Sequence, residues 1–243
     1  MDRMIYLSMS GAKAMMQRQD TLSHNLANAS TPGFKSELAA FRAVPVLGSG
    51  ASTRVYALET TPGYDATPGP VTATGRNLDV AVKGNSWLSV QALDGTEGYT
   101  RGGSLDINAD GTLTTRSGLP VLGDGGPIQV PANTAISIGA DGTVSAKGVD
   151  GKITAVGKLK LVTASADTPL ERGTDGLFRA PDGDLQADPA ARVQDGALEG
   201  SNVSPIETMV SMIAAARQFE SQMKMLQTAE GDEKAAAQLL SMN

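Results

Sequence analysis

The chain has 243 residues, of which 40% are hydrophobic and 4% aromatic, and its formal net charge is −6. This length suffices for at least one buried core, built mainly from aliphatic side chains. The absence of cysteine excludes disulfides and thiolate chemistry. There is no basic block and no apolar run of about 18 residues, so nucleic acid, anionic membrane and membrane insertion are poor expectations.

Residues 2–28 have the periodicity of a long amphipathic helix. Apolar side chains recur at heptad spacing, which predicts a surface that packs against another helix. This N-terminal seam consists of Ile5, Ala12, Met15, Leu22 and Leu26. The run Thr31-Pro32-Gly33 ends the helix, because Pro suits the first corner of a type II turn and Gly the second.

The N-terminus also contains a pattern that resembles a signal cleavage site. Ala12-Lys13-Ala14 has the small-x-small form and follows a mildly apolar stretch. However, Asp2 offsets Arg3, Lys13 is charged, and cleavage would interrupt the helical periodicity. We therefore expect no cleaved signal peptide.

Residues 36–77 have the composition of an extended linking segment, because several prolines occur here together with Thr and Gly. Two stretches, Arg54–Leu58 and Val71–Thr74, predict short strands within it. From residue 78 to residue 200, short β-rich runs such as Trp87–Val90 alternate with Asp-Gly pairs. These pairs favour hairpin turns, so we expect a mostly antiparallel β domain.

Residues 201–243 predict a second long helix. Ser204-Pro205-Ile206-Glu207 is a capping box with Pro at the first helical position. Gly231 costs about 1 kcal/mol relative to Ala in a helix interior, so we expect a kink or an early end near Thr228–Gly231. The apolar side chains form a C-terminal seam of Met209, Met212, Ile213, Ala216, Phe219, Met223 and Leu226.

The predicted fold is therefore α+β. The long N- and C-terminal helices pair as a coiled coil, and a mostly antiparallel all-β domain is inserted between them. The expected divisions are a coiled-coil helix and turn at 1–35, the linking segment at 36–77, the β domain at 78–200, and the second coiled-coil helix at 201–243.

No residue pattern points to chemistry. His24 is the single histidine and has only Asp20 as an acidic neighbour at helical spacing, so neither catalysis nor metal binding is expected. Asp106–Gly111 matches half of a calcium loop, but Ser117 stands where the final carboxylate belongs, which favours a hairpin turn. Gly123–Gly126 lacks the Lys of a phosphate loop. We expect no catalytic residue, cofactor or metal site, and hence no enzyme.

Methionine is concentrated in the two terminal zones. Its adaptable side chain suits a surface that meets slightly different neighbours. One interpretation is an intramolecular helical hairpin that covers its own seam, and the other is the same hairpin with a second face left for neighbouring subunits. The two are compatible, and we favour assembly because helices of this length rarely stand alone.

Three separated motifs resemble the bacterial flagellar basal-body rod and hook protein family. The first is the run from Asn25 to Lys35, the second comprises residues 74–103, and the third extends from Leu198 to Ile213. They occur in the family's order, and the resemblance extends nearly from end to end of the chain. The residues that carry the N-terminal signature are Asn25, Asn28, Thr31, Gly33, Phe34 and Lys35. Stretches such as residues 157–162 are most similar to the proximal rod branch, whereas Ser86 departs from the Gly usual in the family.

The resemblance implies a structural subunit of the rod, the drive shaft that carries motor torque through the periplasm. It implies partners among copies of the chain, other proximal rod proteins, the distal rod protein and the flagellar type III export apparatus, with export that needs no cleaved signal. It also implies an inner coiled-coil layer with the β domain outside. The alternatives are a distal rod or hook subunit, or a secreted β-domain binding module with an aromatic-lined cleft.

Overall fold

The computed structural model describes residues 2–45, 55–59, 63–165 and 168–241. The chain divides into two compact units. The first comprises Met1–Ala29, Ser36–Asp65 and Val203–Asn243, and the second comprises Ser30–Lys35 and Ala66–Asn202. Each unit therefore combines segments that are far apart in the sequence.

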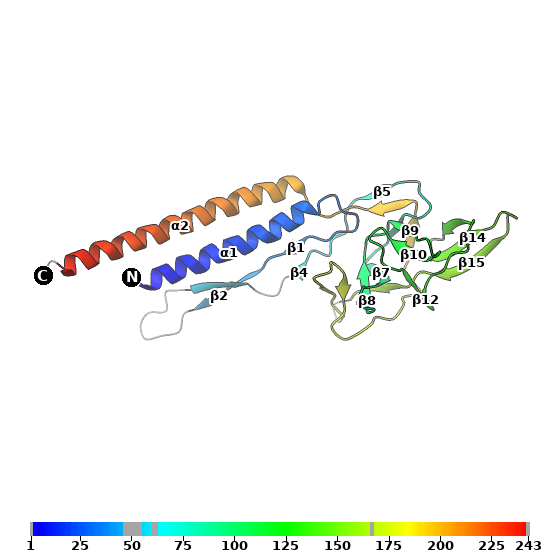
Figure 1. Cartoon of the computed structure of the whole chain (residues 1–243), viewed down its shortest axis with the longest axis horizontal. Helices are drawn as coiled ribbons and strands as arrows, with labels where there is room; N and C mark the ends of the chain where they lie inside the picture. The colour runs from blue at the N-terminus through cyan, green and yellow to red at the C-terminus, as the bar shows by residue number, and fades with distance from the viewer. Residues whose placement is uncertain (1, 46–54, 60–62, 166–167, 242–243) are drawn as a thin grey trace. The chain divides into compact units, whose positions relative to one another are not determined.

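Two long helices form the first unit, α1 (Asp2–Ala27) and α2 (Pro205–Ser241), and they lie side by side (Figure 1). The predicted start of α2 is confirmed. Pro205 is its first residue, and the Ser204 hydroxyl caps the helix by accepting the Glu207 N–H at 3.5 Å. Neither helix is long and apolar enough over its described residues to cross a membrane.

The expected break near Gly231 is wrong, because α2 continues without interruption to Ser241. The glycine is exposed, and no atom lies within 4 Å of the place where a Cβ would be. Its cost of about 1 kcal/mol is offset by the strong helix formers that follow, including Lys234 and Ala235.

Two strand pairs complete the first unit. β1 (Glu37–Leu38) pairs with β4 (Gly63–Tyr64), and β2 (Phe41–Pro45) pairs with β3 (Val55–Glu59), both antiparallel. The strand expected at Arg54–Leu58 thus appears as β3, although Arg54 itself lies outside the described residues. α1 contacts β1 and β3, so this segment is packed against the helix.

The second unit is built from antiparallel strands. A five-stranded sheet has the order β16-β7-β8-β18-β17, and a three-stranded sheet has the order β13-β14-β15. Two-stranded ladders join β9 to β10, β11 to β12, β6 to β19 and β5 to β20. The strands are β5 (Val71–Ala73), β6 (Val80–Val82), β7 (Ser86–Gln91), β8 (Glu97–Thr100), β9 (Leu105–Ile107), β10 (Leu113–Thr115), β11 (Leu122–Gly123), β12 (Gly126–Pro127), β13 (Ala135–Ile138), β14 (Thr143–Lys147), β15 (Ile153–Lys158), β16 (Leu161–Thr163), β17 (Glu171–Arg172), β18 (Phe178–Arg179), β19 (Val193–Asp195) and β20 (Ala197–Glu199).

The turns between these strands follow the predicted Asp-Gly chemistry. Gly111 and Gly142 adopt φ of 80° and 84°, the left-handed region that glycine enters without steric cost. β5 confirms the strand expected at Val71–Thr74. The described pairings of this unit are all antiparallel, so the expected mostly antiparallel β domain and the α+β class are confirmed.

The core of the second unit is aliphatic, as the composition predicts. Val80, Leu88, Leu105 and Val193 are fully buried in one cluster with residues of both sheets. Trp87 is buried as well, with its ring centroid 4.6 Å from that of Phe178. The aromatic-lined cleft of a binding module would need exposed aromatic rings, and Trp87 is 1% exposed.

Candidate functional site: the signature segment and the helical seams

The signature begins in the last turns of α1, where Asn25 pairs with the backbone of Glu37. Its Nδ2 donates to the Glu37 carbonyl at 2.9 Å, and its Oδ1 accepts the Glu37 N–H at 2.8 Å. The Asn25 side chain is buried. Its amide takes the place of a neighbouring strand, because it satisfies both the N–H and the carbonyl of Glu37. This pairing fixes the start of β1 beside the end of α1.

Two further signature residues shape the end of the helix. Asn28 closes α1 by donating from its Nδ2 to the His24 carbonyl at 2.9 Å. Thr31 accepts the Phe34 N–H at 3.2 Å, and Gly33 has φ of 72°, so the predicted type II turn is confirmed. The Nδ1 of His24 lies 3.0 Å from Oε2 of Glu37, within hydrogen-bond distance.

Position 33 requires glycine for two reasons: its φ is positive, and the backbone of Arg101 passes close to it. Its N–H donates to the Glu199 carbonyl at 2.8 Å. A Cβ at this position would lie 2.2 Å from the Arg101 carbonyl carbon, which is backbone and cannot turn away. Only glycine therefore fits between these two segments.

Phe34 anchors the segment in the second unit. Its ring is buried, and the guanidinium carbon of Arg172 lies 4.6 Å from the ring centroid, which is a cation–π contact. The Phe34 carbonyl accepts the N–H of Asn202 at 3.3 Å. The signature segment is thus held at Phe34 through both the side chain and the main chain.

Lys35, Arg101 and Glu199 form a buried ion cluster. Lys35 Nζ donates to Glu199 Oε1 at 2.8 Å, and Arg101 Nε donates to Glu199 Oε2 at 2.6 Å. The side chains are 1% exposed for Lys35 and Glu199 and 4% for Arg101. Three charges taken out of water to this degree are stable only when their hydrogen-bonding groups are satisfied.

Backbone groups complete the buried ion cluster. The Gly69 N–H donates to Glu199 Oε1 at 2.9 Å, and Lys35 Nζ donates to the Thr67 carbonyl at 2.7 Å. The Arg101 guanidinium also donates to three backbone carbonyls, those of Val82, Gly84 and Ser86. The cluster therefore ties five distant stretches of the chain together.

Two opposing influences act on the Glu199 carboxyl. Burial, the largest, would raise its pKa, but the hydrogen bond from Lys35, the charge of Arg101 and the Gly69 N–H together outweigh it. The pKa of Glu199 is consequently held below its ordinary value. The carboxylate stays ionised and accepts hydrogen bonds on both oxygens, an arrangement suited to holding backbone segments in place.

Sequence reasoning identified Lys35 but missed both of its partners. Arg101 and Glu199 lie inside the second and third family motifs, at positions otherwise flanked by small and β-forming residues. Charged residues at strand positions of an apolar β domain are a signal of buried pairing, because such groups are seldom buried alone. That signal was present in the sequence.

The residues of the N-terminal seam lie at different depths in α1. Ala12 is buried, whereas Ile5, Met15, Leu22 and Leu26 are half-buried. Within the C-terminal seam, Met212, Ala216, Phe219 and Leu226 are half-buried. The remaining members are exposed: Met209, Ile213 and Met223 at 51%, 56% and 36%.

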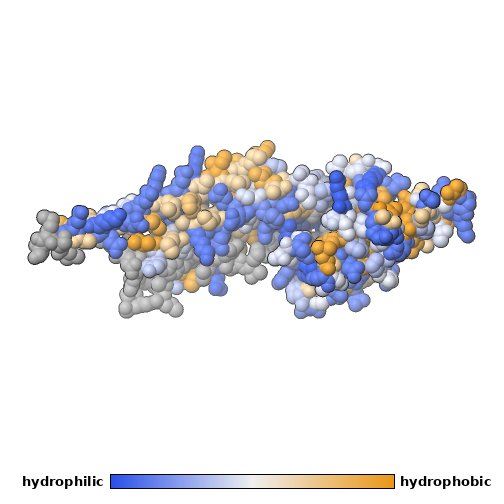
Figure 2. Space-filling view, in the orientation of Figure 1, coloured by the Kyte–Doolittle hydropathy of each residue, from blue (hydrophilic) through white to orange (hydrophobic). Residues whose placement is uncertain are grey.

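The most buried positions of α2 include three small residues that the sequence analysis did not select. Thr208, Ala215 and Ala229 are buried, at heptad-related spacing with Phe219 and Leu226. Their side chains carry little hydrophobic signal, although small residues let helices approach closely. A second apolar stripe is left exposed on α2 at Ile206, Met209, Val210 and Ile213, visible as orange over α2 in Figure 2.

The remaining chemical candidates are structural. Asn108 Oδ1 accepts the N–H groups of Asp110 and Thr112 at 3.0 and 2.8 Å, so Asp106–Gly111 is the expected hairpin turn between β9 and β10. Gly123 and Gly126 belong to the β11–β12 ladder. Among the described residues, no group of three or more His, Cys, Asp or Glu side chains is placed to hold a metal ion.

Three family profiles match the chain in order. "Flagella basal body rod protein" matches residues 5–35, "Flagellar hook protein FlgE/F/G D1 domain" residues 81–146, and "Flagellar basal body rod FlgEFG protein C-terminal" residues 194–239. The first profile ends at Lys35, the last residue of the signature segment.

Curated relatives match over the full length. The flagellar basal-body rod protein FlgF of Salmonella typhimurium is 48% identical over 253 residues, and FlgF of Escherichia coli is 47% identical over 253 residues, with 100% of both chains covered in each case. FlgG of Bacillus subtilis is 31% identical over 252 residues, covering 94% of this chain and 95% of that protein. The chain therefore belongs to the flagellar basal-body rod protein family, and its similarity to FlgF extends from end to end.

Proposed function

We propose that the chain is a structural subunit of the proximal part of the flagellar basal-body rod, and that it assembles with copies of itself and with other rod proteins. The observation that carries this proposal is the exposed apolar stripe on α2. Ile206, Val210 and Ile213 are 77%, 62% and 56% exposed on a helix whose other face already packs against α1. Contiguous exposed apolar surface of this kind is typical of interaction sites.

The two helices pair as a coiled coil in this proposal. The support is the heptad spacing of Thr208, Ala215 and Ala229 together with that of Met212, Phe219 and Leu226 on the same helix. A seam of this kind distributes torsion over many small contacts, which suits a shaft that transmits motor torque. Neighbouring subunits then cover the exposed stripe.

The signature segment is the part of the chain that connects α1 to the β domain. It begins within the last turn of α1 at Asn25, turns at Gly33 and ends in the buried ion cluster at Lys35, so load carried by the chain here reaches charged groups that are all hydrogen-bonded. In the assembled rod the domains are the helix and turn at 1–35, the linking segment at 36–77, the β domain at 78–200 and the second helix at 201–243.

We further propose that the subunit reaches the periplasm-spanning rod through the flagellar type III export apparatus, without cleavage of a signal peptide. Ala12 and Ala14 are both buried in the middle of α1, so cleavage beside them would remove part of the helical layer. The partners in this proposal are copies of the chain, other proximal rod proteins and the distal rod protein. We propose no catalytic activity and no cofactor.

The test is the substitution Ile213→Asp in the full chain. The side chain is 56% exposed, so the isolated protein should unfold at an unchanged temperature, while a buried charge in the subunit contact should abolish swimming. The matched control is Gln218→Asp, which places the same charge at another exposed position of α2. Full swimming of the Ile213→Asp strain, with the protein present in purified basal bodies, would contradict the proposal.

A further inference from the structure

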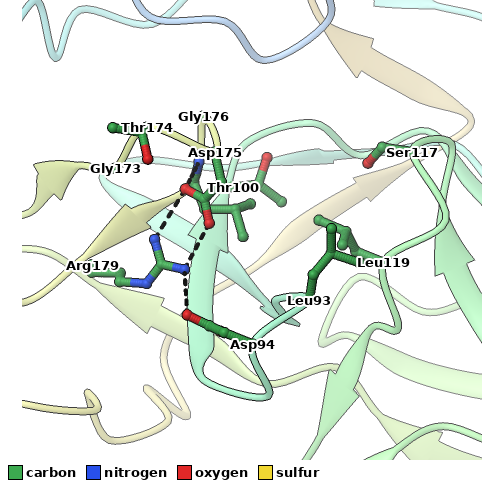
Figure 3. Close-up of a pocket in the computed structure, with 11 residues that line it drawn as sticks. Leu93, Asp94, Thr100, Ser117, Leu119, Gly173, Thr174, Asp175, Gly176 and Arg179 are labelled. Atoms are coloured by element: carbon green, nitrogen blue, oxygen red, sulfur yellow. Dashed lines mark hydrogen bonds and ion pairs between the residues drawn. The ribbon is translucent and has the colours of Figure 1, made fainter.

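The second unit contains an open hollow of about 660 Å³ beside the β7–β8 turn, lined by residues of that turn, of Ser117–Leu119 and of Gly173–Arg179 (Figure 3). One side of the hollow is apolar. Leu93 and Leu119 face each other in Figure 3, and the buried Leu177 also contributes to the lining. Leu93 is 97% exposed. Leaving a leucine side chain in water forgoes about 1.5–3 kcal/mol of burial free energy, which a partner covering it would recover.

The other side of the hollow is charged. Arg179 donates to both carboxylate oxygens of Asp175, at 3.0 and 2.7 Å, and lies 3.7 Å from Asp94. The hydrogen bond from Arg179 lowers the pKa of Asp175, and the hydrogen bond from the Thr96 side chain lowers that of Asp94. Both carboxylates are therefore ionised at neutral pH, and with one guanidinium they leave a single net negative charge.

A complementary surface lies at the tip of the β14–β15 hairpin, defined here as residues 147–153. Val149 and Ile153 are 94% and 67% exposed at this tip. Lys147 and Lys152 flank Asp150, all three exposed, so the tip carries one net positive charge. The hairpin lies at the right-hand edge of the view in Figure 1, where Figure 2 shows an orange patch.

The tip is an ordered structure. Gly148 donates its N–H to the Lys152 carbonyl at 3.0 Å, and Gly151 donates to the Gly148 carbonyl at 3.0 Å. The Lys152 N–H donates to Asp150 Oδ1 at 3.1 Å. Because the turn is fixed by these bonds, Val149 is presented to solvent without further loss of backbone entropy on binding.

We propose that the tip of one copy binds in the hollow of a second copy, with Val149 against Leu93 and Leu119 and with Lys152 toward Asp94 and Asp175. This inference rests on the proposed function as a self-assembling subunit. The lining of the hollow includes no residue of the tip, so the two are separate surfaces of one molecule. A copy that inserts its tip still offers its own hollow, so such a heterologous contact can repeat from copy to copy into a ring or a helical assembly.

The absence of cysteine makes this contact directly testable. Full-length Val149→Cys and Ser117→Cys proteins are expressed together, as the only copies, in the source bacterium, and basal bodies are purified under mild oxidation. Disulfides form only between residues whose Cα atoms approach within about 7 Å. The expected result is a cross-linked dimer containing one copy of each variant, about tenfold more abundant than with the control pair, because docking raises the local thiol concentration.

The control pair combines Ser117→Cys with Asp110→Cys, which is also exposed in the second unit. The inference is overturned if the Val149→Cys and Ser117→Cys pair gives no more cross-linked dimer than the control pair. If both variants are present in basal bodies and the cells swim, the proposed function stands all the same. A cross-link from Val149→Cys to a different rod protein overturns the assignment of a second copy. Absence of the unsubstituted chain from basal bodies would overturn the proposed function itself.

A charge variant tests the same contact independently. Lys152→Glu should lower the yield of the Val149–Ser117 cross-link severalfold, since it reverses the tip charge facing Asp94 and Asp175. Lys83→Glu, at another exposed lysine of the second unit, should leave the yield unchanged. Equal yields with both variants would show that the tip charge plays no part in docking and would overturn the proposed orientation.

Discussion

The Nζ of Lys35 lies 2.8 Å from Oε1 of Glu199, although 164 positions separate the two residues in the chain. Both side chains are 1% exposed. The ion pair therefore joins the last residue of the N-terminal signature to β20, immediately before the chain continues toward α2. Removing Glu199 would leave the buried cations Lys35 and Arg101 without a carboxylate, whereas removing Lys35 would leave Glu199 paired with Arg101.

We predict that Glu199→Gln destabilises the protein by roughly 3–5 kcal/mol, because Lys35 and Arg101 would remain buried with no carboxylate between them. The change is nearly isosteric, so the loss reports charge and not volume. The measurement is urea unfolding of the full chain followed by fluorescence of Trp87. The control is Glu171→Gln at an exposed position of β17, where we expect a change within about 0.5 kcal/mol. Similar midpoints for both variants would contradict a stabilising role of the cluster.

The same carboxylate predicts a pH dependence. The pKa of Glu199 is lowered in the folded chain from an ordinary value of 4.5, so its contribution is complete above about pH 4.5. Stability is lost as the pH falls from there through the lowered pKa. The stability difference between the natural chain and Glu199→Gln should therefore shrink on acidification. Other carboxylates with lowered pKa, such as Asp175, occur in both proteins and cancel in this difference. A difference that stays constant from pH 7 to pH 3 would argue against it.

Local patterns were sufficient to predict most of the fold. The capping box at Ser204 determines the start of α2 within a few residues, and the Asp-Gly pairs determine turns such as that at Gly142. Both signals act between near neighbours, so they are readable without tertiary structure. The prediction of a kink at Gly231 was wrong because it rested on one residue's helix propensity, about 1 kcal/mol. The favourable helix formation of the residues on both sides outweighs that cost.

The buried ion cluster was not predictable in the same way. No periodicity links Lys35 to Arg101 or Glu199, since their contact depends on how the β domain closes around the signature segment. The buried track of α2 was missed for a different reason. Thr208 and Ala215 are small, and a hydrophobicity pattern gives most weight to the larger Met209 and Ile213, which the structure leaves exposed.

We predict that Gly33→Ala destabilises the second unit by roughly 2–5 kcal/mol. An alanine would have to hold φ near 72° and place its Cβ 2.2 Å from the Arg101 carbonyl carbon, so strain and overpacking add. The check is the thermal unfolding midpoint of the full chain. Gly125→Ala is the matched control, because this glycine has no positive φ and no atom within 4 Å of the added Cβ. Equal midpoints for the two variants would show that the backbone relaxes at Gly33 without cost.

The last prediction concerns the pairing of Asn25 with Glu37. Asn25→Ala removes the partner of the Glu37 N–H and of its carbonyl, which lie 2.8 and 2.9 Å from the amide, and should destabilise the first unit by about 1–3 kcal/mol. Hydrogen exchange of the Glu37 amide measures this directly, and its protection should fall severalfold.

Asn25→Asp separates the two bonds, because a carboxylate still accepts the Glu37 N–H but cannot donate to the carbonyl. We therefore expect this variant to retain part of the amide protection while losing stability, since a buried carboxylate would face a carbonyl oxygen. Ser23→Ala, at an exposed position of α1, serves as the control with unchanged exchange. If the Glu37 amide exchanged as slowly in Asn25→Ala as in the control, the β1–β4 pairing alone would hold β1, and the Asn25 amide would not be what fixes this segment.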